Sequence, residues 1–125
     1  MEFDIARTVL EALERERVRY AVFGAVAVNL HGLARSTEDL DLFVAPEREN
    51  VQYVPPDGPF HVDILTRLGE AFRWDDLEVE RVPFEGLMVS VVTPRTLYRM
   101  KRDTVRAKDK GDAEALRARF KLGDV

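Results

Sequence analysis

Two aspartates interrupt an otherwise apolar run, Asp39-Leu40-Asp41-Leu42-Phe43-Val44. Successive side chains of a β-strand point to opposite faces, so Asp39 and Asp41 share one face while Leu40, Leu42 and Val44 share the other. The apolar face can pack on a core. The two carboxylates repel each other unless a cation lies between them, and the usual partner is a hard divalent ion with oxygen ligands. The run therefore predicts a strand with one metal-binding, acidic face.

A third carboxylate stands on a second predicted strand, residues 60–65. Phe60, Val62 and Ile64 alternate there with His61, Asp63 and Leu65, so Asp63 lies on the face opposite the apolar one. If the two strands are neighbours in one sheet, Asp39, Asp41 and Asp63 converge.

A turn suited to an anion is predicted upstream of these aspartates. Residues 18–23 are rich in β-branched and aromatic side chains and predict a strand, which ends at Gly24. Residues 25–30 predict a short buried helix. The free backbone N–H groups of Gly24 and Ala25 would then face outward at a helix start and could bind an anion. The same junction also occurs in many α/β units for packing reasons alone.

The other predicted elements complete one α/β (α+β) domain, residues 1–125, with a mixed sheet flanked by helices. An amphipathic helix is predicted over 4–16, with Asp4 as its N-cap, and a connection with some helical character over 68–74. Strands 77–82 and 87–92 are predicted to form a hairpin around a turn at 83–86. Two helices follow, one from Pro94 to about Lys101 capped by Thr93 and a last one over 113–120 capped by Asp112. Pro46 could open a further helix, but the Pro-rich loop at 55–59 follows so soon that this helix would be unusually short unless residues between Asn50 and Val51 are missing.

The amino-acid composition limits the kinds of catalytic and metal site that the chain can contain. The chain has 125 residues, 46% of them hydrophobic, no cysteine and two histidines. The absence of cysteine excludes thiol catalysis and zinc-cysteine sites, and two isolated histidines give little support to a histidine-based catalyst. We expect His31 and His61 to be structural. The acidic start resembles no signal peptide and no apolar run is long enough to span a bilayer, so we expect a cytoplasmic protein with no membrane contact.

Positive charge gathers in one segment although the net charge is -4. Residues 95–110 contain seven basic residues, Arg95, Arg99, Lys101, Arg102, Arg106, Lys108 and Lys110, interrupted only by Asp103 and Asp109. The pattern fits a solvated helix face with salt bridges and a phosphate-binding face about equally well. RNA is one possible partner of this segment.

These motifs together resemble the polymerase-β-type nucleotidyltransferase superfamily. Its signature is an apolar strand, a Gly-Gly or Gly-Ser turn that opens a helix, an Asp-x-Asp strand, and a third aspartate on a later strand. Gly24 and Ala25 match the turn, Asp39 and Asp41 match the pair, and Asp63 matches the third acid. The sequence around Arg35 and Thr37 resembles that of the small bacterial branch related to abortive-infection nucleotidyltransferases. The downstream pairs Met100-Lys101, Lys108-Asp109 and Asp112-Ala113 add to this resemblance.

The resemblance implies transfer of a nucleoside monophosphate from an NTP to an acceptor, with release of pyrophosphate. The three aspartates would serve two Mg²⁺ ions ~4 Å apart, with Asp63 completing the catalytic metal's shell and helping to deprotonate the acceptor. Gly24 and Ala25 would present N–H groups to the triphosphate. Four further contacts to phosphate or acceptor are implied at Arg35, Thr37, Lys101 and Lys108. Where the family often has serine, this chain has Ala25, so a hydroxyl contact to phosphate is absent.

Two functions follow from the resemblance. One is an active Mg²⁺-dependent nucleotidyltransferase that acts on a small molecule, a protein or an RNA end. The other is a binding module with the same fold that holds a small helical partner protein as one component of a toxin-antitoxin or defence pair. The intact set of Asp39, Asp41 and Asp63 favours the enzyme, while Ala25 and the small size favour the binding module.

Overall fold

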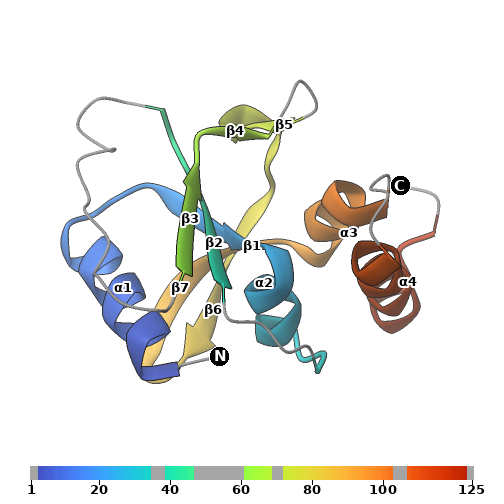
Figure 1. Ribbon diagram of the computed structural model, residues 1–125, viewed down its shortest axis with the longest axis horizontal. Helices are drawn as coiled ribbons and strands as arrows, with labels where there is room; N and C mark the ends of the chain where they lie inside the picture. Colours follow the sequence, from blue (N-terminus) through green and yellow to red (C-terminus); the bar gives the residue numbers. More distant parts are fainter. Residues whose placement is uncertain (1–2, 35–38, 47–60, 69–71, 103–106, 124–125) are drawn as a thin grey trace.

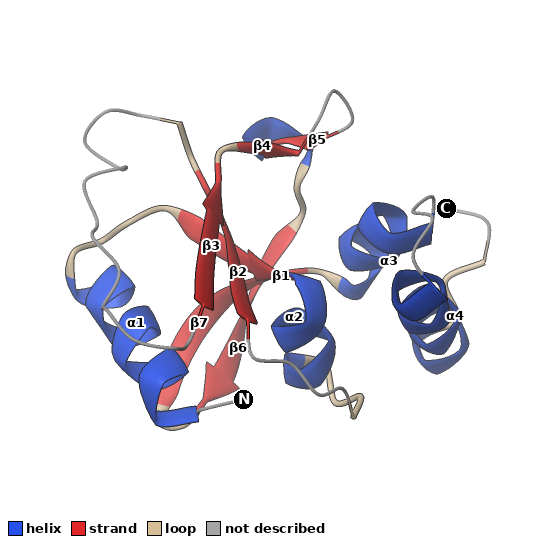
Figure 2. Ribbon diagram, in the orientation of Figure 1, coloured by secondary structure: helices blue, strands red, loops and turns tan. Residues whose placement is uncertain are grey.

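The computed structural model describes residues 3–34, 39–46, 61–68, 72–102 and 107–123. The elements are, in order, α1 (Phe3–Arg15), β1 (Tyr20–Phe23), α2 (Gly24–Leu30), β2 (Asp39–Val44), β3 (His61–Leu65), β4 (Arg67–Leu68), β5 (Phe72–Arg73), the 3₁₀ helix η2 (Trp74–Asp76), β6 (Val79–Phe84), β7 (Leu87–Val92), α3 (Pro94–Arg102) and α4 (Ala107–Phe120). Figures 1 and 2 show the sheet with α1 at one end of the molecule and the α3–α4 pair at the other.

Five strands form a mixed sheet in the order β3-β2-β1-β7-β6. β2 runs parallel to β3 and antiparallel to β1, while β1 runs parallel to β7 and β7 antiparallel to β6. The prediction of a mixed sheet flanked by helices is therefore confirmed. The two aspartate-bearing strands are direct neighbours.

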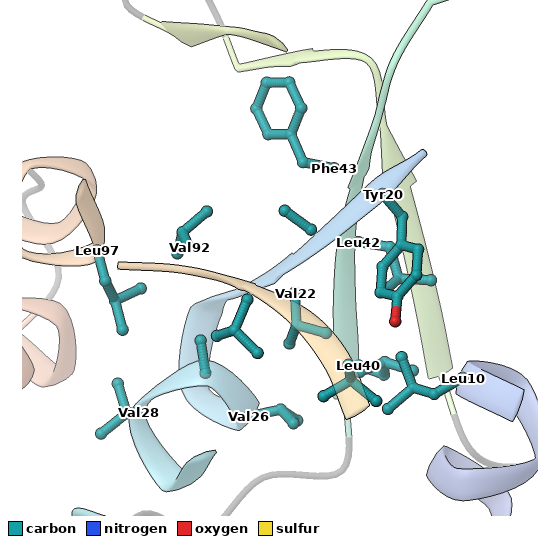
Figure 3. Close-up of a cluster of buried hydrophobic side chains, with 14 of the residues drawn as sticks. Leu10, Tyr20, Val22, Val26, Val28, Leu40, Leu42, Phe43, Val92 and Leu97 are labelled. Atoms are coloured by element: carbon teal, nitrogen blue, oxygen red, sulfur yellow. The ribbon is translucent and has the colours of Figure 1, made fainter. Parts of the chain in front are cut away.

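The apolar face of the sheet is covered by α1 and α2. Leu40 and Leu42 of β2 are fully buried, as the alternation predicts. Figure 3 shows the side chain of Leu40 between Leu10 of α1 and Val26 of α2. Because these side chains belong to one buried cluster, the core fixes β2 with its aspartates on the opposite face.

A buried polar contact ties α1 to the sheet. The Tyr20 hydroxyl donates to Glu14 Oε2 at 2.6 Å and accepts from the Ser90 backbone N–H at 3.1 Å. Arg81 donates to both carboxylate oxygens of Glu14, at 2.8 and 2.7 Å. The hydrogen bond from Arg81 holds the pKa of Glu14 below its ordinary value, and burial raises the pKa of Tyr20. These groups stabilise the fold and lie outside the acidic face.

Three predicted elements differ from the structure. Residues 68–74 were expected to have helical character, but β4 and β5 pair antiparallel there and the 3₁₀ helix begins only at Trp74. The hairpin turn is Glu85-Gly86 rather than 83–86, because positive φ at both residues, 48° and 82°, makes a two-residue turn that matches the strand twist. Helix α1 begins at Phe3, so Asp4 lies in its first turn and is not the N-cap.

The C-terminal helix is longer than predicted. α4 begins at Ala107, so Asp112 lies inside it and cannot be its cap. The carboxylate of Asp112 is turned toward α3, where it binds a lysine. The caps of α3 agree with prediction, since Thr93 Oγ1 accepts from the backbone N–H of Thr96 at 3.3 Å.

None of the described helices is both long enough and apolar enough to cross a bilayer. The possible helix after Pro46, together with Arg35, Thr37 and Arg106, lies outside the described residues.

Candidate active site

The parallel pairing of β2 and β3 brings the predicted carboxylates together. Asp41 lies directly opposite Asp63, and Asp39 lies opposite His61. Neighbouring strands are about 4.8 Å apart, so the side chains of Asp41 and Asp63 meet on one face of the sheet. The structure therefore places Asp39, Asp41 and Asp63 on adjacent strands, as the sequence predicts.

Asp41 occupies the centre of this acidic face. Its neighbour across β1 is Phe23, and Phe43 is its same-face neighbour along β2. The rings of Phe23 and Phe43 meet edge-on with centroids 5.9 Å apart, and Phe43 is fully buried. Asp41 is thus held between an apolar wall and a second carboxylate.

This environment raises the pKa of Asp41 from 3.8 to about 6. Burial is the largest cause, followed by the charge of Asp63, a side-chain hydrogen bond with Asp63 and the charge of Asp39, while the charge of Lys101 acts in the opposite direction. Two carboxylates that share a proton in this way carry excess negative charge when both ionise. A cation at this face would relieve that repulsion.

Gly24 is required at the turn that follows β1. Its φ is +70°, and a Cβ built on it would lie 2.1 Å from Asp41 Oδ2. No heavier residue fits without displacing that carboxylate. The Gly24-Ala25 turn is therefore in direct contact with the acidic face. The turn and the aspartate strand, which the sequence predicts as two separate motifs, thus belong to one site.

Replacing Gly24 with alanine is expected to destabilise the protein and to weaken binding of Mg²⁺ and nucleotide. The positive φ alone costs an alanine about 1 to 2 kcal/mol, and the added Cβ must also push Asp41 aside. Gly86→Ala is the matched control, since Gly86 has a φ of +82° and open space around an added Cβ. Chemical denaturation and calorimetric titration with Mg²⁺ and NTP measure both effects. Equal ligand binding by the two variants would show that the contact with Asp41 is unimportant.

The donor set of the acidic face suits Mg²⁺. In the part of the chain that the structure describes, no group of three His, Cys, Asp or Glu side chains is placed so that it could hold a metal ion. Mg²⁺ rarely needs such a cage, because it usually binds one or two carboxylates together with water and the phosphates of a substrate. The adjacent carboxylates of Asp41 and Asp63 provide that number of protein ligands.

Lys101 is buried between α3 and α4. Its ammonium donates to Asp109 Oδ1 at 3.1 Å and to Asp112 Oδ2 at 2.9 Å, and the residue is only 6% exposed. It also lies close enough to Asp41 to counteract the increase in that residue's pKa. The structure thus places the predicted contact Lys101 beside the acidic face, with its ammonium bound by two carboxylates.

Sequence reasoning missed the role of Asp109 and Asp112. A signal was present: Lys101 follows Leu97 by four residues, so it shares the buried face of α3, and Asp109 and Asp112 are three residues apart on one face of α4. A lysine on a buried helix face requires acidic partners.

The remaining predicted residues have separate positions. Lys108 is exposed in the first turn of α4, and Ala25 is buried. His31 is structural, as expected: its Nε2 donates to the Val92 carbonyl oxygen at 2.7 Å and its side chain is 4% exposed. His61 lies on β3, opposite Asp39.

A cavity of about 510 Å³ lies at the other end of β2. It is lined by Arg19, Ala45, Pro46, Thr66, Arg73, Trp74 and Asp75. Among the predicted site residues that the structure describes, none lines it, so it is separate from the acidic face.

Comparison with solved structures places this arrangement among known folds. An antigenic nucleotidyltransferase-like protein from Paracoccidioides brasiliensis matches with a TM-score of 0.63 and 13% sequence identity, over 91% of this chain and 74% of the other. The chain has a nucleotidyltransferase-like fold. The antibiotic-resistance factor ANT(2'')-Ia, whose solution structure shows a substrate-regulated conformation dynamics, matches with a TM-score of 0.60 and 15% identity, over 96% of this chain and 91% of that factor. No family model and no curated protein matches this nucleotidyltransferase-like chain by sequence.

Proposed function

We propose that this protein is a Mg²⁺-dependent nucleotidyltransferase that moves a nucleoside monophosphate from an NTP to an acceptor hydroxyl. The observation that carries the proposal is the register of β2 and β3, which sets Asp41 against Asp63 on the face that carries Asp39. The direct contact between Asp41 and the Gly24 turn supports it. The assignment to the small bacterial branch is a further proposal, which rests on the sequence motifs alone.

Each residue has a chemical task in this proposal. Asp41 and Asp63 would hold the metal ions together with substrate phosphates, with Asp39 beside them on β2, and the bound ions would neutralise phosphate charge and orient the reacting oxygens. Gly24 and Ala25 present backbone N–H groups toward the triphosphate. The charge of Lys101, whose ammonium is bound by Asp109 and Asp112, opposes the increase in the pKa of Asp41.

The transfer is a single displacement at phosphorus. The acceptor oxygen forms a bond to the α-phosphorus while the bond from that phosphorus to the bridging oxygen of the β-phosphate breaks, and pyrophosphate leaves with the electron pair. The proton of the acceptor hydroxyl passes to the carboxylate of Asp63. That residue is suited to the task because it is exposed and can be reached from solution, whereas Asp41 is half-buried.

Ala25 favours a second candidate, a binding module that holds NTP without turnover as one component of a toxin-antitoxin or defence pair. The position carries no hydroxyl for phosphate. A partner protein would then replace the acceptor. Nucleotide binding without transfer is the result that separates this candidate from the enzyme.

The test is label transfer in the presence of Mg²⁺, total RNA and cell extract. NTPs labelled at the α-phosphate are expected to label an acceptor, and the same NTPs labelled at the γ-phosphate are not, because the γ-phosphate leaves with pyrophosphate. The Asp39→Asn/Asp41→Asn variant is expected to lose the labelling because it lacks both carboxylates of β2.

The control variant is Glu16→Gln/Glu85→Gln, which removes the same charge from two exposed positions. It should label as the natural protein does. Equal labelling by the aspartate variant would exclude the carboxylate site, and tight NTP binding without any labelling would favour the binding module.

A further inference from the structure

The cavity of about 510 Å³ at the end of β2 has walls from three parts of the chain. The first wall comes from the residues that precede β1 and follow β2, Arg19, Ala45 and Pro46. Thr66, between β3 and β4, forms the second, and residues 73–75, which run from β5 into η2, form the third. In Figure 1, the β4–β5 pair lies beyond the end of β3. The volume is sufficient for a small organic molecule, since ligand pockets begin at about 300 Å³.

Backbone hydrogen bonds hold these walls in place. The Ala45 N–H donates to the Arg19 carbonyl oxygen at 3.0 Å, which fixes the first wall. β4 and β5 pair antiparallel, so the second wall is joined to the third. The Leu77 N–H donates to the Trp74 carbonyl oxygen at 3.2 Å and closes the turn of η2. The cavity is therefore built from fixed backbone and needs no ligand to form it.

The lining combines one aromatic ring with one net positive charge. Trp74 is half-buried and packs against the core, so its indole has a fixed position at the cavity. Arg19 and Arg73 supply two positive charges and Asp75 supplies one negative charge. Guanidinium groups favour an acidic ligand, which they bind through paired N–H donors, whereas the charge of Asp75 disfavours a dianion such as a phosphate monoester. The Asp75 carboxylate accepts hydrogen bonds, so it favours a ligand that also carries a donor.

We propose that this cavity binds a small planar monocarboxylate that carries an amino or hydroxyl donor, of the aromatic amino-acid class to which 2-aminobenzoate belongs. The ring packs against the indole of Trp74, an arrangement that adds to the free energy gained by burial alone. The carboxylate accepts from Arg19 and Arg73, and the donor group binds Asp75.

This site is separate from the one that the proposed function uses. Ala45 follows Asp41 by four residues of extended chain, which corresponds to about 13 Å. The fully buried side chain of Phe43 lies between the two positions on β2. Binding at the cavity therefore does not depend on nucleotidyl transfer.

The fluorescence of Trp74 tests the proposal directly, because Trp74 is the only tryptophan of the chain. The probe is 2-aminobenzoate, which absorbs at the wavelengths at which tryptophan emits, and it is added without NTP or Mg²⁺. Binding is expected to quench the tryptophan emission and to excite the probe in a saturable way. Half-saturation is expected at or below about 10 mM, the value for a ligand of roughly ten non-hydrogen atoms at ordinary ligand efficiency.

The variant Arg73→Gln is expected to bind the probe at least about tenfold more weakly, because a charge-assisted hydrogen bond is lost. The matched control is Arg95→Gln, which removes an exposed arginine of α3 that does not line the cavity. Its affinity should equal that of the natural protein, and thermal unfolding checks that both variants are folded. Equal affinities for the two variants, or no saturable energy transfer, would overturn the proposed site.

The variant Asp41→Asn tests the separation from the acidic face. It should bind the probe as tightly as the natural protein does. Loss of binding in this variant would place the probe at the acidic face and overturn the assignment to the cavity.

Displacement of the probe by other small molecules tests the class of ligand. Benzoate should displace it, whereas benzamide, which lacks the charge, should require at least about tenfold higher concentration. Cyclohexanecarboxylate, which lacks the aromatic ring, should require about threefold more than benzoate. Equal displacement by benzamide would overturn the role of the arginines, and inorganic phosphate that competes as well as benzoate would overturn the choice of a monocarboxylate.

Discussion

Replacing Asp41 with asparagine is expected to abolish nucleotidyl transfer and at the same time to stabilise the metal-free protein. The transfer rate should fall by about a thousandfold or more, since a lost metal contact removes several kcal/mol of transition-state stabilisation. The gain in stability follows from the environment of the carboxylate. Burial and the charges of Asp63 and Asp39 all disfavour an ionised Asp41 in the folded state.

The stabilisation should depend on pH in a defined direction. Because the folded state raises the pKa of Asp41 from 3.8 to about 6, the ionised carboxylate destabilises the fold above about pH 6 and has no such effect below about pH 4. A shift of this size corresponds to about 2 kcal/mol after allowance for solvent screening at a half-buried site. Urea denaturation of both proteins at several pH values measures it.

Magnesium provides the complementary measurement. Mg²⁺ should stabilise the natural protein at neutral pH and have less effect on Asp41→Asn, because the ion relieves the same repulsion that the substitution removes. Glu85→Gln is the control, since its carboxylate is exposed on the hairpin turn. A variant Asp41→Asn that is less stable than the natural protein at pH 8 would contradict the strained carboxylate pair.

Replacing Lys101 with methionine is expected to cause the largest loss of stability. The substitution leaves Asp109 and Asp112 without the buried ammonium that they share, and breaking a buried ion pair in this way costs about 3 to 5 kcal/mol. Chemical denaturation measures the change in the free energy of unfolding. Lys108→Met, at an exposed position seven residues further along the chain, should change it by less than about 0.5 kcal/mol.

Two further measurements separate this explanation from loss of packing alone. Adding Asp109→Asn and Asp112→Asn to Lys101→Met should recover part of the lost stability, because the two carboxylates that shared the ammonium are then neutral. The pKa of Asp41 should rise further in Lys101→Met, since Lys101 lowers it. A triple variant less stable than Lys101→Met, or an unchanged pKa of Asp41, would contradict the assigned role of Lys101.

Local sequence was sufficient to predict burial where a periodic pattern coincides with the core. Alternation in β2 predicted that Leu40, Leu42 and Val44 are buried, because a one-residue slip would expose Leu40 and Leu42 and bury both aspartates. Alternation did not predict the burial of Phe43, which lies on the face of the aspartates. It was less informative at residues 68–74, where two-residue strands are too short for any period to show. The start of α4 was missed because its first residues are charged and carry no apolar repeat.

The sequence by itself determined the strand faces that carry Asp39, Asp41 and Asp63, and the place of a strand-to-helix turn at Gly24. Alternation and backbone freedom are local properties, so they can be read from neighbouring residues. Only the tertiary structure decided that Asp41 pairs with Asp63, that Gly24 touches Asp41, and that Asp109 and Asp112 turn inward to Lys101. Those outcomes depend on strand register and helix packing between distant segments, which are set by burial of the whole core.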